Sequence, residues 1–210
     1  MTKPRLLDLF CGGGGCSRGY AEAGFDVTGV DIAPQKHYPY PFVQGDARAY
    51  LAAHGHEYDV IHASPPCQGY SALATMHPDR KHPLLIDEVR KRLQDTGKPY
   101  IIENVERATL DGVVLCGSMF DLRIARGWLR RHRKFETSFF VWQPECRHPA
   151  EKAVGVYGHG GHSGKHRMLC AREAAEIMRI DWMNRDELAQ AIPWVYTQYI
   201  GGFAIEVVRG

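Results

Sequence analysis

The sequence predicts an α/β fold with a mostly parallel central sheet and helices on both of its faces. Three observations support this prediction. Short apolar segments alternate along the chain with stretches of helical periodicity. A run of glycines follows the first apolar segment and precedes a helical stretch, an arrangement that binds nucleotide-like ligands. Polar and reactive side chains stand where several predicted strands end, which is where such sheets place their chemistry.

The composition suits one domain with a hydrophobic core, because the chain has 210 residues of which 44% are hydrophobic. Its formal net charge is only +2, so a nucleic-acid surface must come from local clustering, and the densest basic run lies within residues 123–134. The six cysteines form no CxxC pair, which favours a reducing compartment. Because we find neither a signal peptide nor a membrane-length apolar run, we expect a soluble, cytoplasmic protein.

The first predicted unit is a strand at residues 5–10, a glycine loop, and a helix at residues 17–23 that ends at Gly24. The loop does not fit the G-x-G-x-x-G pattern, because Ser17 or Arg18 occupies the third glycine position, and this argues against NAD. No Lys-Ser/Thr pair follows the glycines, which argues against ATP. An ordinary tight turn is the alternative, although four consecutive glycines exceed what a turn needs.

Two further predicted strands, at residues 25–31 and 42–47, end in acids. Asp31 lies about twenty residues past the glycine loop, where a carboxylate can accept hydrogen bonds from ribose hydroxyls; the alternative is a cap or turn aspartate. Asp46 could accept from an adenine amino group or merely cap a helix at residues 47–53. Acids at successive strand ends after a glycine loop indicate an adenosine-bearing ligand without a triphosphate.

The predicted strand at residues 58–63 leads into Pro65-Pro66-Cys67-Gln68. The two prolines fix the backbone before the thiol, since each locks φ. We therefore interpret Cys67 as a nucleophile. Residues 68–83 are irregular and suit a loop that closes over a substrate.

A helix at residues 84–96 precedes a predicted strand at residues 100–105, whose apolar run is broken by Glu103 and Asn104. A carboxylate there is costly unless it is paired or takes part in chemistry. The alternative is a rim glutamate in a salt bridge.

The second half of the sequence predicts strands at residues 113–116 and 134–142. Arg131 and Arg133 lie two residues apart, so they share one face if the segment that contains them is extended. The alternative for these two arginines is a solvated basic rim. Residues 143–166 form a glycine-rich loop. Helices are predicted at residues 167–180 and from Asn184 or Arg185 to before Pro193, and residues 196–208 read as a loop feeding a C-terminal helix. Zinc is an alternative that we do not favour, because the spacing of the candidate ligands matches no known finger. Those candidates are Cys146, His148, His159, His162, His166 and Cys170.

Several of these stretches, in this order, resemble motifs of the cytosine-C5 methyltransferases, and the resemblance covers nearly the whole chain. They are Asp8-Leu9-Phe10-Cys11 with Gly12–Gly15, Pro65-Pro66-Cys67-Gln68, Glu103-Asn104-Val105, Arg131-His132-Arg133, residues 167–173, and Gln198–Gly202. The resemblance implies a Rossmann-like methyltransferase fold that depends on S-adenosyl-L-methionine. It also implies a single catalytic domain over residues 1–210, with a rudimentary target-recognition segment at residues 141–166, as in compact phage and bacterial enzymes.

The resemblance also assigns roles to individual residues. The expected catalytic residues are Cys67, Glu103, Arg131 and Arg133. The expected cofactor-binding residues are Phe10, Cys11, Gly12, Gly13, Gly14, Gly15, Asp31, Ile32, Asp46, Ala47, Pro65 and Gly201. The expected substrate-binding residues are Pro66, Gln68, Ser71, Asn104 and Lys165.

The implied activity is transfer of the cofactor methyl group to C5 of a cytosine flipped out of double-stranded DNA, which leaves S-adenosyl-L-homocysteine. Gly202-Phe203 stands where the family usually has Asn-Ser, which puts side-chain contacts near the cofactor's methionine end in question. We expect a monomer without a metal, with selectivity that is short, weak or supplied by a partner. A tRNA cytosine-C5 methyltransferase, a non-catalytic DNA-binding relative and a small-molecule methyltransferase are the alternatives. The target sequence and any link to restriction stay open.

Overall fold

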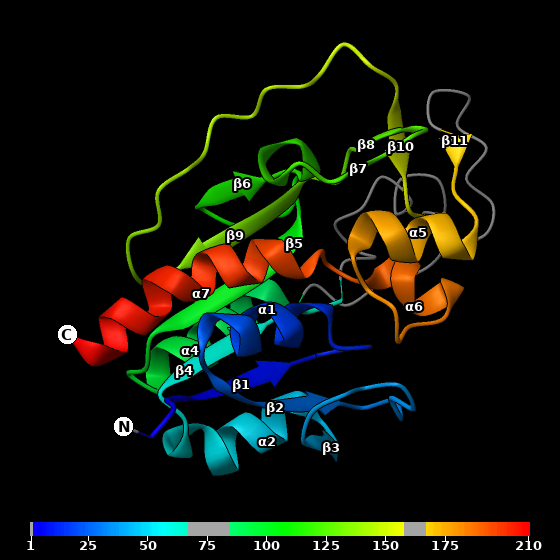
Figure 1. Cartoon of the computed structure of the whole chain (residues 1–210). Helices are drawn as coiled ribbons and strands as arrows, with labels where there is room; N and C mark the ends of the chain where they lie inside the picture. The colour runs from blue at the N-terminus through cyan, green and yellow to red at the C-terminus, as the bar shows by residue number, and fades with distance from the viewer. Residues whose placement is uncertain (1, 67–84, 158–166) are drawn as a thin grey trace, which may run out of the picture.

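The structure is a computed structural model that describes residues 2–66, 85–157 and 167–210 (Figure 1). Its main sheet has the strand order β3-β2-β1-β4-β5-β9-β6. The first five run parallel to one another, whereas β9 is antiparallel to both β5 and β6. The strands are β1 (Arg5–Leu9), β2 (Asp26–Asp31), β3 (Phe42–Gln44), β4 (Val60–Ala63), β5 (Tyr100–Val105), β6 (Val113–Leu115) and β9 (Arg133–Thr137). The predicted mostly parallel α/β sheet is confirmed.

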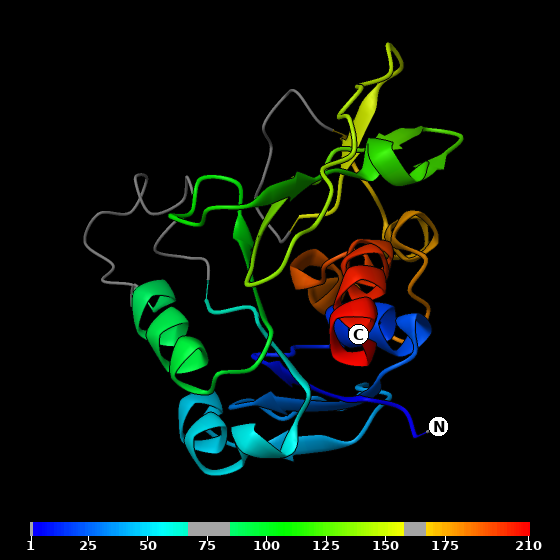
Figure 2. The same ribbon diagram turned by 90° about the vertical axis from the view of Figure 1, so that its left-hand side faces the viewer.

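Helices cover both faces of this sheet (Figure 2). The helices α1 (Gly15–Ala23) and α7 (Trp194–Arg209) pack together on one face, and α2 (Ala47–His54) and α4 (Ile86–Asp95) lie on the other. Alternate residues of a strand face opposite sides. In β1, Leu6 therefore belongs to the core beneath α1 and α7, whereas Leu7 and Leu9 belong to the opposite core.

A smaller sheet has the order β11-β10-β8-β7. Its strands are β7 (Arg123–Ile124), β8 (Gly127–Leu129), β10 (Ala153–Gly155) and β11 (Arg167–Met168). Residues 138–152 contain neither a helix nor a strand and form the long extended connection from β9 to β10 at the top of Figure 1. The remaining elements are the short helices η1 (Gly55–Glu57), η2 (Gly117–Phe120), α5 (Ala171–Met178) and α6 (Arg185–Gln190).

Three predicted elements have different bounds in the structure. The strand predicted to reach residue 142 ends at Thr137, whose hydroxyl donates to the carbonyl of Phe139 at 2.6 Å and turns the chain. The helix predicted from residue 167 begins at Ala171, where Cys170 and Glu173 form a capping box. The loop expected at the start of residues 196–208 lies inside α7, which begins at Trp194, because packing of the apolar face of α7 outweighs the cost of glycine in a helix, which is about 1 kcal/mol per residue.

The helices α1 and α7 approach each other closely at Gly19. A Cβ added there would lie 2.1 Å from Thr197 Oγ1 and 2.1 Å from the Trp194 carbonyl oxygen. The Thr197 hydroxyl also donates to the Cys16 carbonyl at 2.9 Å. The crossing of the two helices therefore depends on the missing side chain at position 19.

A chain of polar groups lies inside the core under α1. Asp8 Oδ2 accepts a hydrogen bond from Ser17, and the Ser17 hydroxyl lies 2.7 Å from Tyr38 Oη. His62 Nδ1 and Nε2 lie 2.8 Å from Tyr20 Oη and 2.8 Å from Ser64 Oγ.

Burial sets the charge state of this polar chain. It lowers the pKa of His62 to about 3, so the ring is neutral and its 4.0 Å separation from Asp8 is no ion pair. Burial raises the pKa of Asp8 to about 7, although the hydrogen bond from Ser17 opposes the shift.

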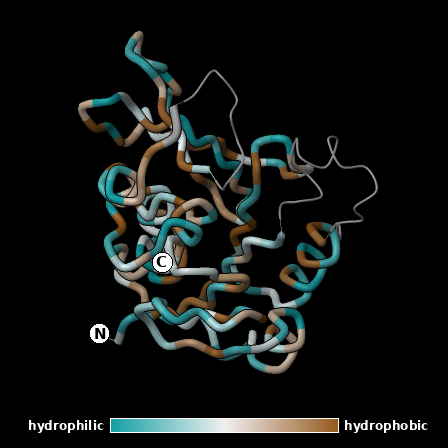
Figure 3. The backbone as a smooth tube through the Cα atoms, turned by 90° about the vertical axis from the view of Figure 1, so that its right-hand side faces the viewer, coloured by the Kyte–Doolittle hydropathy of each residue, from teal (hydrophilic) through white to brown (hydrophobic). Residues whose placement is uncertain are grey.

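Hydrophobic stretches run through the middle of the molecule (Figure 3).

Among residues 2–66, 85–157 and 167–210, no helix combines the length and apolar character needed to cross a membrane.

Gly19→Ala should destabilise the protein by about 1–3 kcal/mol, because a methyl group overpacks the α1–α7 crossing. The matched control is Gly202→Ala on α7, where an added Cβ meets nothing within 4 Å. That change should leave the protein unaltered or up to about 1 kcal/mol more stable, from helix propensity. Urea unfolding measures both, and an equal effect of the two substitutions would contradict the packing.

Asp8→Asn should gain stability relative to the wild type as pH rises from about 4 to about 7. The native carboxyl has a pKa of about 7 against 3.8 for an exposed group. In this window the native state therefore keeps a proton that the unfolded state releases, and rising pH removes stability from the wild type alone. Urea unfolding at several pH values measures the difference.

The control for this prediction is Asp46→Asn. Hydrogen bonds from the side chain and backbone of Arg48 lower the pKa of Asp46 to about 2. The contribution of Asp46 should therefore change only below about pH 4. A constant difference between Asp8→Asn and the wild type over pH 4–7 would refute the assignment.

Candidate active site

A cavity of about 610 Å³ opens where β1, β2, β4 and β5 end, within the usual size range of ligand sites. The loops after β1 and β2, the ends of β4 and β5, the start of β9 and the end of α6 contribute its walls. It is lined by Asp8, Phe10, Cys11, Gly12, Gly13, Gly15, Cys16, Asp31, Ile32, Ala33, Gln35, Ser64, Pro65, Pro66, Glu103, Arg133, Glu187, Ala189, Gln190, Ala191 and Ile192. The sheet thus places its strand ends as the sequence predicts.

The glycine loop contains backbone conformations with positive φ, which residues other than glycine adopt only at a cost in free energy. Gly12 and Gly14 have φ angles of 50° and 90°, and Gly14 is the residue before α1. A Cβ on Gly15 would lie 2.5 Å from the Ile192 carbonyl oxygen, so the missing side chain lets the segment after α6 approach the loop. Trp182 holds the loop from the same side through a hydrogen bond from Nε1 to the Gly13 carbonyl at 2.9 Å.

Asp31 joins the second strand end to the glycine loop. Its Oδ2 accepts from the Gly12 amide at 3.0 Å and its Oδ1 from the Ala33 amide at 2.9 Å. Both oxygens keep a further lone pair for a ligand hydroxyl. The neighbouring Ile32 side chain lines the cavity yet is 74% exposed, which offers an apolar surface to a flat ring.

Glu103 and Arg133 form an ion pair in the cavity wall. Arg133 Nε lies 3.1 Å from Glu103 Oε1, without the alignment of a hydrogen bond. Among the described residues Oε1 has no hydrogen-bond partner, and it is buried. Burial raises the pKa of Glu103, while the Arg133 charge and a hydrogen bond with Ser64 oppose the shift. The carboxyl is thus shifted towards its protonated form and can exchange a proton with a ligand.

Pro65 and Pro66 line the cavity, and a hydrogen bond to their backbone holds them in place. Asn104 Nδ2 donates to the Pro65 carbonyl at 2.9 Å, and Asn104 Oδ1 accepts from the Val105 amide at 3.0 Å. Asn104 is 1% exposed and does not line the cavity. Its side chain therefore positions the Pro65-Pro66 backbone, and its expected role in substrate binding stays a prediction.

Two thiols, of Cys11 and Cys16, line the described part of the cavity. Both are buried, and burial raises the pKa of each. Neither is a ready nucleophile, because the thiolate is the reactive form. The predicted nucleophile, Cys67, lies outside the described residues, as do Gln68, Ser71 and Lys165.

Arg131 does not line the cavity, whereas Arg133 does. The strand β9 begins only at Arg133, so the two residues do not share an extended segment. The Arg131 guanidinium instead donates to the Val156 carbonyl at 2.7 Å and to the Ala189 carbonyl at 3.0 Å. Arg131 therefore ties β9 to the small sheet and to α6.

Four expected cofactor-binding residues also lie outside the cavity lining: Gly14, Asp46, Ala47 and Gly201. Asp46 is the N-cap of α2, where its side chain accepts from the Arg48 and Ala49 amides. Gly201 lies inside α7, and a Cβ there would stand 2.7 Å from that of Ala23. Its role is close helix packing.

The sequence analysis assigned no role to several residues that line the cavity. For Asp8 the sequence did contain a signal: it is an acid within an apolar strand. An acid is costly to bury unless it has a function. No sequence signal marked residues 187–192, since only the folded chain brings the end of α6 over the glycine loop.

Comparisons with known proteins point to one family. The family model described as C-5 cytosine-specific DNA methylase matches residues 4–111, just over half of the chain. The Type II methyltransferase M.XorII of Xanthomonas oryzae pv. oryzae is 32% identical over 127 residues. That match covers 52% of this chain and 30% of M.XorII.

Solved structures share the fold at low sequence identity. The S. pombe Dnmt2 methyltransferase has a TM-score of 0.66 at 13% identity, and the Entamoeba histolytica methyltransferase EhMeth has 0.67 at 11%. Both matches cover 100% of each chain. The family model, which matches just over half of the chain, shows that the chain belongs to the C-5 cytosine-specific DNA methylase family.

Proposed function

We propose that the chain transfers a methyl group from S-adenosyl-L-methionine to C5 of a cytosine in DNA. One observation carries the proposal. A single cavity is lined by the glycine loop, by Pro66 (the residue before Cys67) and by the Glu103–Arg133 pair. A methyl-donor site and a proton-donating carboxyl therefore face the same space. Family membership supports the same chemistry.

The cofactor fits the residues of the glycine side of the cavity. Asp31 would accept from the ribose hydroxyls, and the exposed Ile32 side chain would lie against the adenine ring. The described loop offers no lysine for a triphosphate, which agrees with a nucleoside ligand. When bound, S-adenosyl-L-methionine supplies an electrophilic methyl group on a sulfonium.

The residues on the other side would activate the base. Cytosine C5 is a poor nucleophile, so we propose that the Cys67 thiolate forms a bond to C6, which makes C5 nucleophilic. Glu103 would donate its proton to N3 as negative charge develops on the ring, and the Arg133 cation beside it would hold the base. After methyl transfer, a base removes the C5 proton, the bond between C6 and sulfur breaks to release the Cys67 thiolate, and N3 returns its proton to Glu103.

The base must leave the duplex to reach this site, because a stacked cytosine hides C6. The small sheet and residues 138–157 carry basic side chains: Arg123 lies on β7, Arg126 in the β7–β8 turn, and Arg147 and Lys152 in the connection. We propose that they contact DNA, which extends the expected recognition segment of residues 141–166 back to β7 at Arg123. So small a unit suits short or weak selectivity, and a partner would add to it.

The proposal is tested by methyl transfer from labelled S-adenosyl-L-methionine to duplex DNA and to unmodified tRNA, with the purified chain. We expect label in DNA, located at C5 of cytosine by sequencing, and none with Cys67→Ala. Cys170→Ser, which removes the exposed thiol of the N-cap residue before α5, is the matched control and should stay active.

Each alternative predicts another outcome of this test. Label in tRNA alone indicates a tRNA methyltransferase, and DNA binding without transfer indicates a non-catalytic relative. Transfer to a small molecule with no nucleic-acid substrate indicates the third alternative. Any of these would refute the proposal.

Glu103→Gln should lower the single-turnover rate by about 10²–10⁴, because the amide keeps the shape of the carboxyl and loses the proton that it donates. Binding of S-adenosyl-L-homocysteine, measured by calorimetry, should stay within a few-fold of the wild type. A variant that methylates at the wild-type rate would remove Glu103 from the mechanism.

A further inference from the structure

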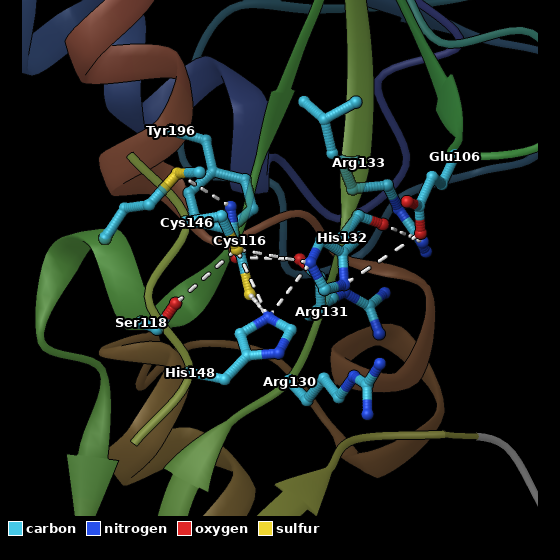
Figure 4. A network of polar contacts seen from close by, with 12 residues as sticks. Glu106, Cys116, Ser118, Arg130, Arg131, His132, Arg133, Cys146, His148 and Tyr196 are labelled. Carbon is cyan, nitrogen blue, oxygen red and sulfur yellow. Dashed lines mark hydrogen bonds and ion pairs between the residues drawn. The ribbon is translucent and has the colours of Figure 1, made fainter. Parts of the chain in front are cut away.

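Two cysteines and two histidines converge outside the cavity lining (Figure 4). One of them, His132, stands between Arg131 and Arg133 in the sequence. Cys116 directly follows β6, and His132 directly precedes β9. Cys146 and His148 belong to the connection at residues 138–152. Cys116 is buried, whereas Cys146 and His148 are exposed, so the cluster lies at the edge of the core and can be reached from solvent.

The donor atoms face one another at short distances. The Nε2 atoms of His132 and His148 lie 3.3 Å apart. Cys146 Sγ lies 3.5 Å from His132 Nε2 and 3.2 Å from His148 Nε2. Cys116 Sγ lies 3.9 Å from His148 Nε2. All four ligand atoms fall within 4.8 Å of one another.

These separations match a tetrahedral zinc site. With Zn–N of about 2.05 Å and Zn–S of about 2.3 Å, tetrahedral angles place two nitrogens about 3.3 Å apart and a nitrogen and a sulfur about 3.5 Å apart. We propose that Cys116, His132, Cys146 and His148 bind one Zn²⁺ ion. Four protein ligands leave no open position, so the site is structural. The two thiolates neutralise the charge of the Zn²⁺ ion.

The surroundings of the histidines support metal binding. His132 Nδ1, the nitrogen away from the cluster, lies 4.0 Å from Glu106 Oε2, on the side where metal-bound histidines commonly have a carboxylate. The His148 ring stacks against Trp128, with ring centroids 4.9 Å apart. Both rings are thus oriented with Nε2 towards the thiols.

The site would hold the connection at residues 138–152 against the catalytic domain. This segment has no helix or strand. Its two ends are held by hydrogen bonds between Ser138 and Tyr100 and from Trp128 to the carbonyls of Glu151 and Lys152. Between these ends, Gln143 bonds both backbone groups of Val114, and Tyr199 donates to the Trp142 carbonyl. So short a segment cannot build a core of its own. Because His132 adjoins Arg133, the metal would also fix the start of β9 beside Glu103.

The test is metal analysis of the full chain, purified without a polyhistidine tag or chelator and under reducing conditions. We expect about one zinc per chain. Cys146→Ser should weaken zinc binding by more than about 100-fold, since loss of an outer partner alone typically costs 10–100-fold. Cys170→Ser is the matched thiol control and should keep its zinc. Cys67→Ala should also keep it, which separates this proposal from the methyl-transfer proposal.

Cobalt substitution gives a second measurement that does not depend on the folding of a variant. Co²⁺ in the wild-type chain should show a thiolate-to-cobalt charge-transfer band and the intense visible bands of a tetrahedral ion. A reduced chain that takes up neither metal, zinc retained in Cys146→Ser, or a Cys116–Cys146 disulfide in the freshly isolated protein would each overturn the zinc site.

Discussion

The arrangement of the candidate site depends on the contact between Arg133 and Glu103. Removing two charges from water is costly unless they meet in good geometry, and here both side chains are largely buried, 17% and 7% exposed. The contact requires β9 to run antiparallel beside β5, with Phe135 opposite Glu103 and Arg133 opposite Val105. Arg133 is then a diagonal neighbour of Glu103, a separation that a long side chain spans. Arg131 and the Tyr196 hydroxyl, which donates to the Arg131 carbonyl at 2.8 Å, fix the approach to the strand.

The parallel half of the sheet supplies the other side of the cavity. Successive strands deliver the glycine loop, Asp31 and the proline pair to one edge, because the ends of parallel strands lie together. The α1–α7 crossing at Gly19 supports this edge from one face. Asn104 links the two halves, since it follows Glu103 on β5 and holds the Pro65 carbonyl after β4. The glycine-loop side and the Glu103 side of the cavity are therefore parts of one framework.

Local sequence patterns predicted what depends on a single strand and the loop that follows it. The strand at residues 100–105 has the predicted bounds, and the glycine loop except Gly14 lines one cavity with Asp31 and Glu103. Contacts between distant segments were not predictable. Arg131 and Arg133 have the same side chain, so the sequence alone does not tell their roles apart. Only the folded chain brings the Val156 and Ala189 carbonyls within hydrogen-bond distance of Arg131. Cys116 and His132 join Cys146 and His148 from separate stretches, so the spacing within residues 146–170 gave no valid zinc pattern.

In the proposed reaction, this cavity brings a methyl donor and a cysteine nucleophile to one cytosine. The most direct measurement is intact mass spectrometry of the chain with S-adenosyl-L-methionine and duplex DNA in which 5-fluorocytosine replaces cytosine. Fluorine replaces the C5 proton that must leave, so the reaction stops before the bond between C6 and sulfur breaks. The account predicts a complex with the mass of protein, DNA strand and one methyl group, linked through Cys67. Duplex binding without such an adduct, or an adduct through another residue, would contradict it.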